Sequence, residues 1–244
     1  MTIKKFNSTQ QTQNTLPVLR IPVAVDLVVL TVRDGALCVL LIKRGVAPFK
    51  GKWALPGGFV CAGESLETAA ERELAEETGI AAAHVGYMEQ LGTFSAPNRD
   101  PREHIIAVAY LAFVPNLPEP QAGGDAHSVF ILPVSQLFKG DEKLAFDHEI
   151  ILQAGVERTR AKLEYTPLAA AFCGSEFTIN ALRKVYEAVW GCTLDAPNFH
   201  RKVTKTAGFV VATDAQTSGE SGRPALLYTQ GDVLTLYPPM LRGN

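Results

Sequence analysis

The stretch from 58 to 80, GFVCAGESLETAAERELAEETGI, constrains this chain of 244 residues more than any other. Ser65, in the first half of this stretch, and Gly79, near its end, predict a helix of about 66–78 between them. On that helix Glu73, Glu76 and Glu77 stand at i, i+3 and i+4 and share one face. Like charges at this spacing destabilise a helix, and a solvated surface is the ordinary explanation for a charge run. Carboxylates gathered in this way also supply the hard oxygen ligands that Mg²⁺ or Mn²⁺ prefers.

Two neighbours of these acids extend the pattern. Glu64 lies just before the helix and can reach the same cluster, while Arg72 can form an ion pair that orients the carboxylates. The full spacing is G-x5-E-x7-R-E-U-x-E-E-x-G-U, where U is an apolar residue. Every fixed position is filled, by Gly58, Glu64, Arg72, Glu73, Leu74, Glu76, Glu77, Gly79 and Ile80. A match this complete argues against a solvated acidic face.

This segment resembles the Nudix box, and about residues 20–160 resemble Nudix domains. That family hydrolyses a nucleoside diphosphate linked to another moiety. The resemblance implies an αβα sandwich built on a mixed sheet, with Mg²⁺ or Mn²⁺ held by Glu73, Glu76 and Glu77. Metal ions at such a site neutralise the phosphates and acidify the attacking water. We assign the catalytic role to Glu76 and Glu77.

Candidate ligand contacts outside the acidic cluster are Arg44, Gly57, Gly58, Arg99 and Arg102. Arg44 follows a predicted strand and can bind a phosphate bidentately. The glycine pair allows close approach of the backbone, although a purely structural turn explains it equally well. The other two arginines lie in a turn stiffened by prolines, which either places cations at a pocket mouth or is an ordinary solvated turn.

The stretch R-D-P-R at 99–102, just before an apolar strand, is similar to one in Nudix proteins that bind ADP-ribose and in Nudix-fused regulators. The chain departs from the usual neighbours of that stretch at Asn98, Glu103 and His104. Those departures concern the fine shape of the pocket.

Two further questions about the site stay open in the sequence. Trp53 either stacks on a base or packs in the core, and the core is favoured because large aromatic side chains are mostly buried. The second question is which residue outside the box acts as a general base. No residue stands out among the loop candidates Glu119, Asp125, Asp141 and Glu142.

The pattern around the box predicts an α+β fold. Apolar, β-branched runs predict strands, and Asp34-Gly35 joins the first two as a hairpin. These strands are expected at 22–33, 36–42, 85–94, 105–114 and 129–133. A second helix is expected at 147–162. We predict three parts, namely a flexible lead at 1–20, the Nudix domain at 21–165 and a further domain at 166–244.

The order of elements changes in that last part. Helices are expected at 177–190 and 195–206, followed by strands at 209–213 and 225–228. Two short helices followed by a β hairpin is the order of a winged helix-turn-helix.

The second of these helices carries a basic stripe. Asn198, Arg201, Lys202 and Lys205 recur at i, i+3, i+4 and i+7, about a quarter-turn from an apolar stripe. Asparagine and arginine can read base edges, whereas lysine mostly contacts phosphates. Arg223 lies in the loop between the two strands, where it can contact a minor groove or the DNA backbone. The alternative is a basic, solvated helix in an accessory or dimerisation domain.

Composition limits the remaining possibilities. The net charge is −2, so a DNA-binding surface must be a local patch. No stretch approaches the ~20 apolar residues that span a bilayer, so we expect a cytoplasmic protein without a membrane partner. The cysteines are widely spaced, which predicts free thiols rather than a disulfide framework or a zinc site. They are Cys38, Cys61, Cys173 and Cys192.

The combination of both parts is similar to the NrtR family, Nudix-related transcriptional regulators of NAD metabolism. The resemblance covers about residues 18–230 and includes FTINALRKVYEAVWGCTLDAPNFHRKV and a G-R-P-A-x-x-Y wing. It implies a repressor that senses ADP-ribose and binds a palindromic operator in double-stranded DNA as a homodimer. It leaves open whether hydrolysis is retained. Two other functions stay open, an ADP-ribose pyrophosphatase whose C-terminal domain serves dimerisation and a Nudix-fused regulator that senses a sugar.

Overall fold

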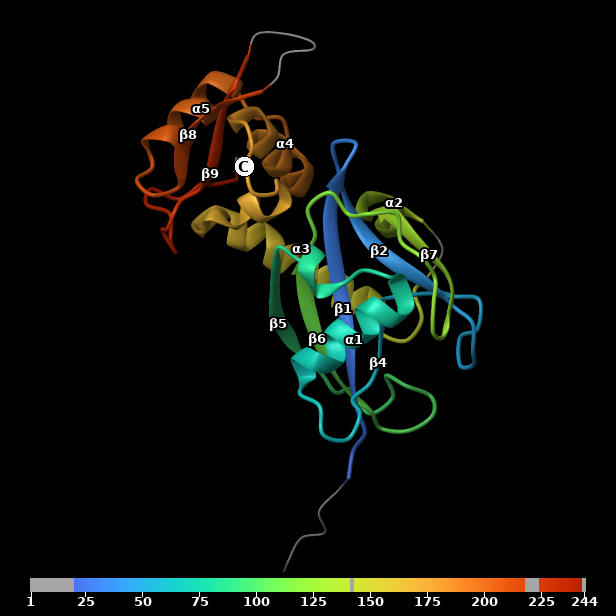
Figure 1. Ribbon diagram of the computed structural model, residues 1–244. Helices are drawn as coiled ribbons and strands as arrows, with labels where there is room; N and C mark the ends of the chain where they lie inside the picture. The colour runs from blue at the N-terminus through green and yellow to red at the C-terminus, as the bar shows by residue number, and fades with distance from the viewer. Residues whose placement is uncertain (1–19, 141–142, 218–223, 243–244) are drawn as a thin grey trace, which may run out of the picture.

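The structure is a computed structural model that describes residues 20–140, 143–217 and 224–242 (Figure 1). Its N-terminal part is built on a hairpin of β1 (Val23–Arg33) and β2 (Ala36–Arg44), joined at Asp34-Gly35 as the sequence predicts. Both residues of that turn have positive φ, which suits the Asp-Gly pair. The predicted flexible lead lies outside the described residues, apart from Arg20.

The hairpin belongs to a seven-stranded mixed sheet with the order β3-β2-β1-β6-β5, with β4 on β1 and β7 on β2. The pair β1 and β6 is parallel, and the other pairs are antiparallel. The bounds of the remaining strands are β3 Trp53–Ala54, β4 Gly57–Phe59, β5 Tyr87–Phe94, β6 Ile106–Phe113 and β7 Ala126–Pro133.

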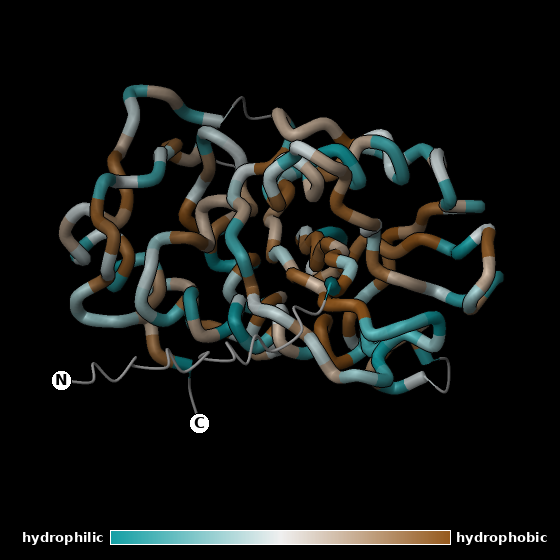
Figure 2. Tube along the Cα trace, turned by 90° about the horizontal axis from the view of Figure 1, so that it is seen from below, coloured by the Kyte–Doolittle hydropathy of each residue, from teal (hydrophilic) through white to brown (hydrophobic). Residues whose placement is uncertain are grey.

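Helices cover both faces of this sheet, so the predicted αβα sandwich is confirmed. On one face α1 (Leu66–Thr78) packs over Val25, Leu27 and Val29 of β1. On the other face α3 (His148–Tyr165) packs over the intervening residues of the same strand. Period-2 alternation along β1 therefore supplies two cores. In Figure 2 the hydrophobic stretches lie mostly inside the trace, and many outer loops are hydrophilic.

The C-terminal part is the predicted winged helix, with α4 (Ile179–Trp190), α5 (Ala196–Lys205), β8 (Val210–Gln216) and β9 (Leu226–Gln230). Apolar residues at helical spacing on and just before α4 are buried: Phe177, Leu182, Val185, Tyr186 and Val189. The first of them lies before the helix, where it pairs with Tyr228 of β9 as an isolated bridge.

Several elements differ from the sequence expectation. The segment between β2 and α1 contains the short strands β3 and β4. Helix α2 (Val134–Lys139) directly follows β7. Strands this short carry no alternation of their own, because pairing with β1 and β2 defines them. Two 3-10 helices were also missed, at Ala82–His84 and Pro167–Phe172.

The end of α3 joins the winged helix to the sheet. The Tyr186 hydroxyl donates to the Leu163 carbonyl, and the Trp190 Nε1–H donates to the Arg160 carbonyl. The hydrophobic core is continuous across this junction. In Figure 1 α3 runs from the sheet toward the orange-to-red winged helix. Because one core spans both parts, the predicted domain bounds of 21–165 and 166–244 stay a prediction. Among the described residues, no helix combines the length and apolarity needed to cross a membrane.

Candidate active site and nucleic-acid interface

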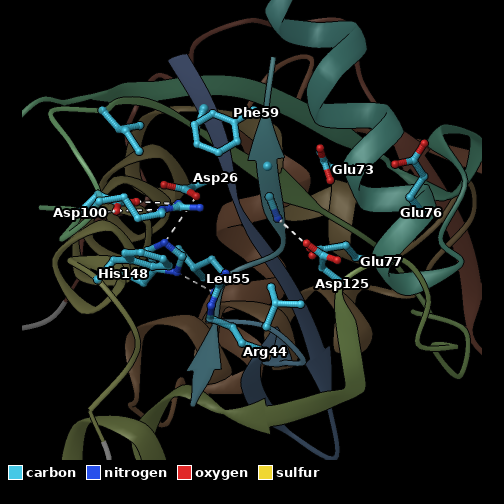
Figure 3. Close-up of a pocket in the computed structure, with 18 of the residues that line it drawn as sticks. Asp26, Arg44, Leu55, Phe59, Glu73, Glu76, Glu77, Asp100, Asp125 and His148 are labelled. Atoms are coloured by element: carbon cyan, nitrogen blue, oxygen red, sulfur yellow. Dashed lines mark hydrogen bonds and ion pairs between the residues drawn. The ribbon is translucent and has the colours of Figure 1, made fainter. Parts of the chain in front are cut away.

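A pocket of about 440 Å³ opens beside the acidic face of α1. Its walls come from β1, β2, β4, α1, the turn at 99–102 and the start of α3. Figure 3 shows Glu73, Glu77 and Asp125 on one side of this pocket and Asp26, Asp100 and His148 on the other. The pocket thus has an acidic wall and a second wall of mixed charge.

On the acidic wall, Arg72 holds three of the box carboxylates. Its guanidinium pairs with Glu64 at 2.8 Å, with Glu73 at 2.7 Å and with Glu76 at 3.2 Å. The predicted ion pair is confirmed, and Glu64 is bound to the same cation. Glu77 is separate, since it is 4% exposed and accepts a 2.9 Å hydrogen bond from the Gly57 N–H.

Gly58 brings the backbone of β4 directly against this cluster. A Cβ at this position would lie 2.2 Å from Oε1 of Glu73, closer than real contacts allow. The glycine therefore serves close approach as well as the turn, which the sequence left undecided.

Burial disfavours the charged form of Glu77. Desolvation raises its pKa from 4.5 to about 8, and the nearby Glu73 and Asp125 carboxylates add to the increase. Desolvation likewise raises the pKa of Glu73, against the opposing Arg72 guanidinium. Hard oxygen donors in a site short of positive charge fit a divalent cation. Among the described residues, no group of three His, Cys, Asp or Glu side chains already has the geometry to hold a metal. Ligation by Glu73, Glu76 and Glu77 stays a prediction.

Glu77 makes the stability of the metal-free protein depend on pH. Because its pKa is higher in the folded than in the unfolded state, folding takes up a proton between pH 4.5 and about 8. Stability should therefore fall as pH rises through that window, by up to ~5 kcal/mol. Denaturant unfolding in EDTA should show a smaller fall for Glu77→Gln. Parallel pH profiles for the two proteins would contradict this assignment.

The second wall contains a buried ion network. The Arg99 side chain is 3% exposed, and its guanidinium pairs with Asp147 at 2.6 Å and with Asp26 at 3.0 Å. His148 Nδ1 accepts from the Leu55 N–H at 2.9 Å, and its Nε2 lies 3.4 Å from Asp26. Burial opposes ionisation of Asp26, yet His148 and Arg99 keep its pKa below the ordinary value.

Cations and aromatic rings line the rest of this wall. The Arg102 guanidinium lies 5.1 Å from the Phe59 ring centroid and 5.8 Å from that of Phe146. The Arg44 guanidinium lies 4.9 Å from the same Phe146 ring. Burial and the neighbouring Arg102 lower the pKa of Arg44. Two adjacent cations beside aromatic faces suit an anionic ligand that carries a ring.

All five predicted ligand contacts, Arg44, Gly57, Gly58, Arg99 and Arg102, line this pocket. Arg99 lies deepest, and two carboxylates already occupy its guanidinium, so it differs from the solvated turn considered as the alternative. Trp53 packs against the core and Phe130, outside the pocket, which confirms the core interpretation. Contact between a ligand and the five predicted residues stays a prediction.

Sequence reasoning missed Asp26, Phe59, Phe146 and His148 as pocket residues. Asp26 lies in an apolar strand, Phe146 and His148 lie at the start of α3, and Phe59 occupies a variable position of the box, so no motif singles them out. Of the general-base candidates, Asp125 lines the pocket, while Glu119 pairs with Arg33 on the surface. Asp141 and Glu142 lie outside the described residues.

The predicted basic stripe forms one face of α5. Asn198, Arg201, Lys202 and Lys205 line a shared hollow together with Pro238, which the sequence had not suggested. Phe199 and Val203, on another side of the helix, are buried in the core. Asp195 caps the helix by accepting from the Asn198 N–H. Arg223 lies outside the described residues.

Fold and site together define a class of protein in which a Nudix pocket and a winged helix share one chain. Residues 20–154 match the NUDIX domain family, and residues 169–229 match the NrtR DNA-binding winged helix domain. The chain is 36% identical over 207 residues to the ADPR responsive transcriptional repressor NtrR of Acinetobacter baylyi, covering 84% of this chain and 80% of that protein. The chain therefore belongs to the NrtR family of Nudix proteins.

Two further relatives show how each part is used elsewhere. Shewanella oneidensis NrtR in complex with a 27mer DNA superposes with a TM-score of 0.71 at 31% identity, covering 85% of this chain and 93% of that one. Its isolated NUDIX domain, solved with ADP ribose, has a TM-score of 0.53 at 34% identity, covering 58% of this chain and 90% of that one. ADP-ribose pyrophosphatase of Methanocaldococcus jannaschii is 44% identical over 115 residues, covering 47% of this chain and 63% of that protein.

Proposed function

We propose that this chain is a transcriptional repressor whose Nudix domain binds ADP-ribose and whose winged helix binds operator DNA. The observation that carries the proposal is that one chain presents both an open, charged pocket and an exposed basic helix face. The cations at Arg44 and Arg102 suit a diphosphate, and the rings beside them suit a base. The relatives from Acinetobacter and Shewanella support both ligands.

DNA binding by this chain is proposed to be dimeric, on a palindromic site in the cytoplasm. One small winged helix contacts few base pairs, whereas two helices related by a two-fold axis read two half-sites. Arg223, in the wing, is proposed to add a contact to the minor groove or to the backbone.

ADP-ribose is expected to weaken operator binding by about 5–150-fold. The ligand changes DNA affinity because it favours one arrangement of the two parts over another. Fluorescence anisotropy of a duplex selected by this chain from random sequence measures the effect. Linkage requires saturating duplex to weaken ADP-ribose binding by the same factor. Equal ligand affinity with and without duplex would refute an ADP-ribose-responsive repressor, and a response to a free sugar instead would identify the alternative sensor.

The basic face of α5 is expected to separate base reading from phosphate binding. Arg201→Ala should cost ~1–3 kcal/mol on the selected duplex and less on random DNA, if Arg201 contacts a base. Lys205→Ala should weaken both duplexes alike and reduce the salt dependence. Lys139→Ala, on α2, is the control and should change neither. An equal loss on both duplexes for Arg201→Ala would show that Arg201 binds only the backbone.

The pocket is also proposed to hydrolyse ADP-ribose slowly when Mg²⁺ or Mn²⁺ is bound. Glu73, Glu76 and Glu77 on one wall, with Glu64 tied to the first two through Arg72, favour this second activity. Similarity to the Methanocaldococcus pyrophosphatase supports it. Glu73, Glu76 and Glu77 would hold the cation, and Asp125 is the described candidate for a base.

A further inference from the structure

We propose that Phe146 contacts the bound ligand and transmits pocket occupancy to the winged helix through α3. This inference rests on the proposed response of DNA binding to ADP-ribose. It adds the residue and the structural route that carry the response.

The backbone of Phe146 is held in an unusual conformation at the pocket wall. Its φ is 54°, in the left-handed region that bulky residues rarely adopt. The Ala145 N–H donates to the Trp53 carbonyl at 2.7 Å, and the Ala145 carbonyl accepts from the His148 N–H at 3.2 Å. The chain on either side of the ring is thus fixed, and strain held in this way is concentrated at functional sites.

The ring itself is half-buried and lines the pocket. It lies 4.9 Å from the Arg44 guanidinium and packs edge-on against Phe49 at 4.8 Å. Its centroid is 5.1 Å from that of His148. A ligand with a planar ring and phosphates must disturb these contacts, because the cations that suit its phosphates already lie against this face.

The two residues that follow Phe146 begin α3 and tie that end to the pocket floor. Asp147 is bound through both carboxylate oxygens by Arg99, at 2.6 and 3.0 Å. His148 accepts from Leu55 and lies against Asp26. A shift of the Phe146 backbone is therefore a shift of the first turn of α3.

The far end of α3 holds the winged helix. Arg160 Nε donates to the Val189 carbonyl at 3.1 Å, and the Glu164 carbonyl accepts from the Met240 N–H at 2.7 Å. Midway, a Cβ on Gly155 would lie 2.8 Å from a methyl of Val28, so α3 packs tightly against the sheet there. The helix has 18 residues and is about 27 Å long. A small tilt about this close contact moves its last turn, and with it α4.

Phe49 provides a matched control for Phe146. It is also phenylalanine, its φ is 61°, and its ring contacts Phe146. It belongs to the loop between β2 and β3, so its backbone does not lead into a helix. Asparagine tolerates positive φ, so Phe146→Asn and Phe49→Asn each remove the ring while keeping the backbone accessible.

The test compares the affinity for the selected duplex with and without saturating ADP-ribose, for the full chain. Calorimetry confirms saturation, and chromatography confirms that the ligand is whole. We expect the wild type and Phe49→Asn to show the same decrease in DNA affinity, about 5–150-fold. Phe146→Asn should bind duplex normally without ligand, and ADP-ribose should change its DNA affinity by less than about twofold. Phe146→Tyr, which keeps the ring, should respond as the wild type does.

A full response of saturated Phe146→Asn overturns the inference, and so does an equal loss in Phe49→Asn. If Phe146→Asn does not fold, Phe146→Leu answers the same question, because it keeps an apolar side chain and loses the planar ring. A wild type that binds duplex but ignores ADP-ribose overturns the proposed function itself, and with it this route. The wild-type measurement alone distinguishes that outcome from a failure of the Phe146 route.

Discussion

Glu77→Gln is expected to reduce the rate of metal-dependent ADP-ribose hydrolysis by ~100-fold or more. A divalent cation needs the charged carboxylate, which metal binding must generate by displacing the proton that burial favours. Glutamine resembles the protonated acid, and its amide oxygen can still accept the hydrogen bond from Gly57. The fold should therefore survive while metal affinity is lost. Release of AMP from ADP-ribose in excess Mg²⁺ measures the rate.

Glu71→Gln is the matched control for this experiment. Glu71 lies on the same helix, is exposed and does not line the pocket, so its substitution should leave the rate unchanged. Glu76→Gln tests the other carboxylate assigned to catalysis, whose side chain is 56% exposed and held by Arg72. Equal rates for wild type and Glu77→Gln would remove Glu77 from the reaction. If the wild type releases no AMP, the box serves binding without catalysis.

Arg99→Met is expected to destabilise the folded protein by ~3–5 kcal/mol. Methionine keeps much of the apolar length of arginine but leaves Asp26 and Asp147 without their shared cation. Asp26 is 6% exposed, so its charge would stay buried with only His148 beside it. Breaking one side of a buried ion network costs more than the network contributes, because the remaining charges stay desolvated. Denaturant unfolding near neutral pH measures the loss.

The control for this substitution is Arg158→Met. Arg158 also pairs with a carboxylate, that of Glu89, but at 3.5 Å and on the surface, so its loss should cost less than ~1 kcal/mol. The double variant Arg99→Met with Asp147→Asn should recover part of the stability, since one buried charge is removed along with its partner. Similar small losses for Arg99→Met and Arg158→Met would mean that water or rearrangement compensates the buried acids.

Local pattern was enough to predict the helix of the box and the strands that surround it. The capping residues Ser65 and Gly79 lie at the two ends of α1, and the side chain of Ser65 accepts from the Thr68 N–H. Periodicity likewise placed Phe199 and Val203 of α5 inside and the basic stripe outside. These features depend on residues within a turn or two of one another, so they are visible in one dimension.

The second wall of the pocket was not visible in that way. Asp26 lies in an apolar strand and His148 at the start of a helix, and neither segment carries a motif. They meet Arg99 only because the parallel pairing of β1 with β6 and the seating of α3 bring distant segments together. Short strands such as β3 and β4 were missed for the same reason, since their partners define them.

The sequence by itself determined the carboxylates of the box, the two-part order of elements and the basic face of α5. Each depends on how residues are spaced along the chain, because helix or strand geometry places residues at that spacing on one face. Only the tertiary structure decided that Arg99 is buried between Asp26 and Asp147, and that Phe146 stands where the pocket meets α3. Burial and pairing depend on segments far apart in the chain, and desolvation then sets the charge of residues such as Glu77.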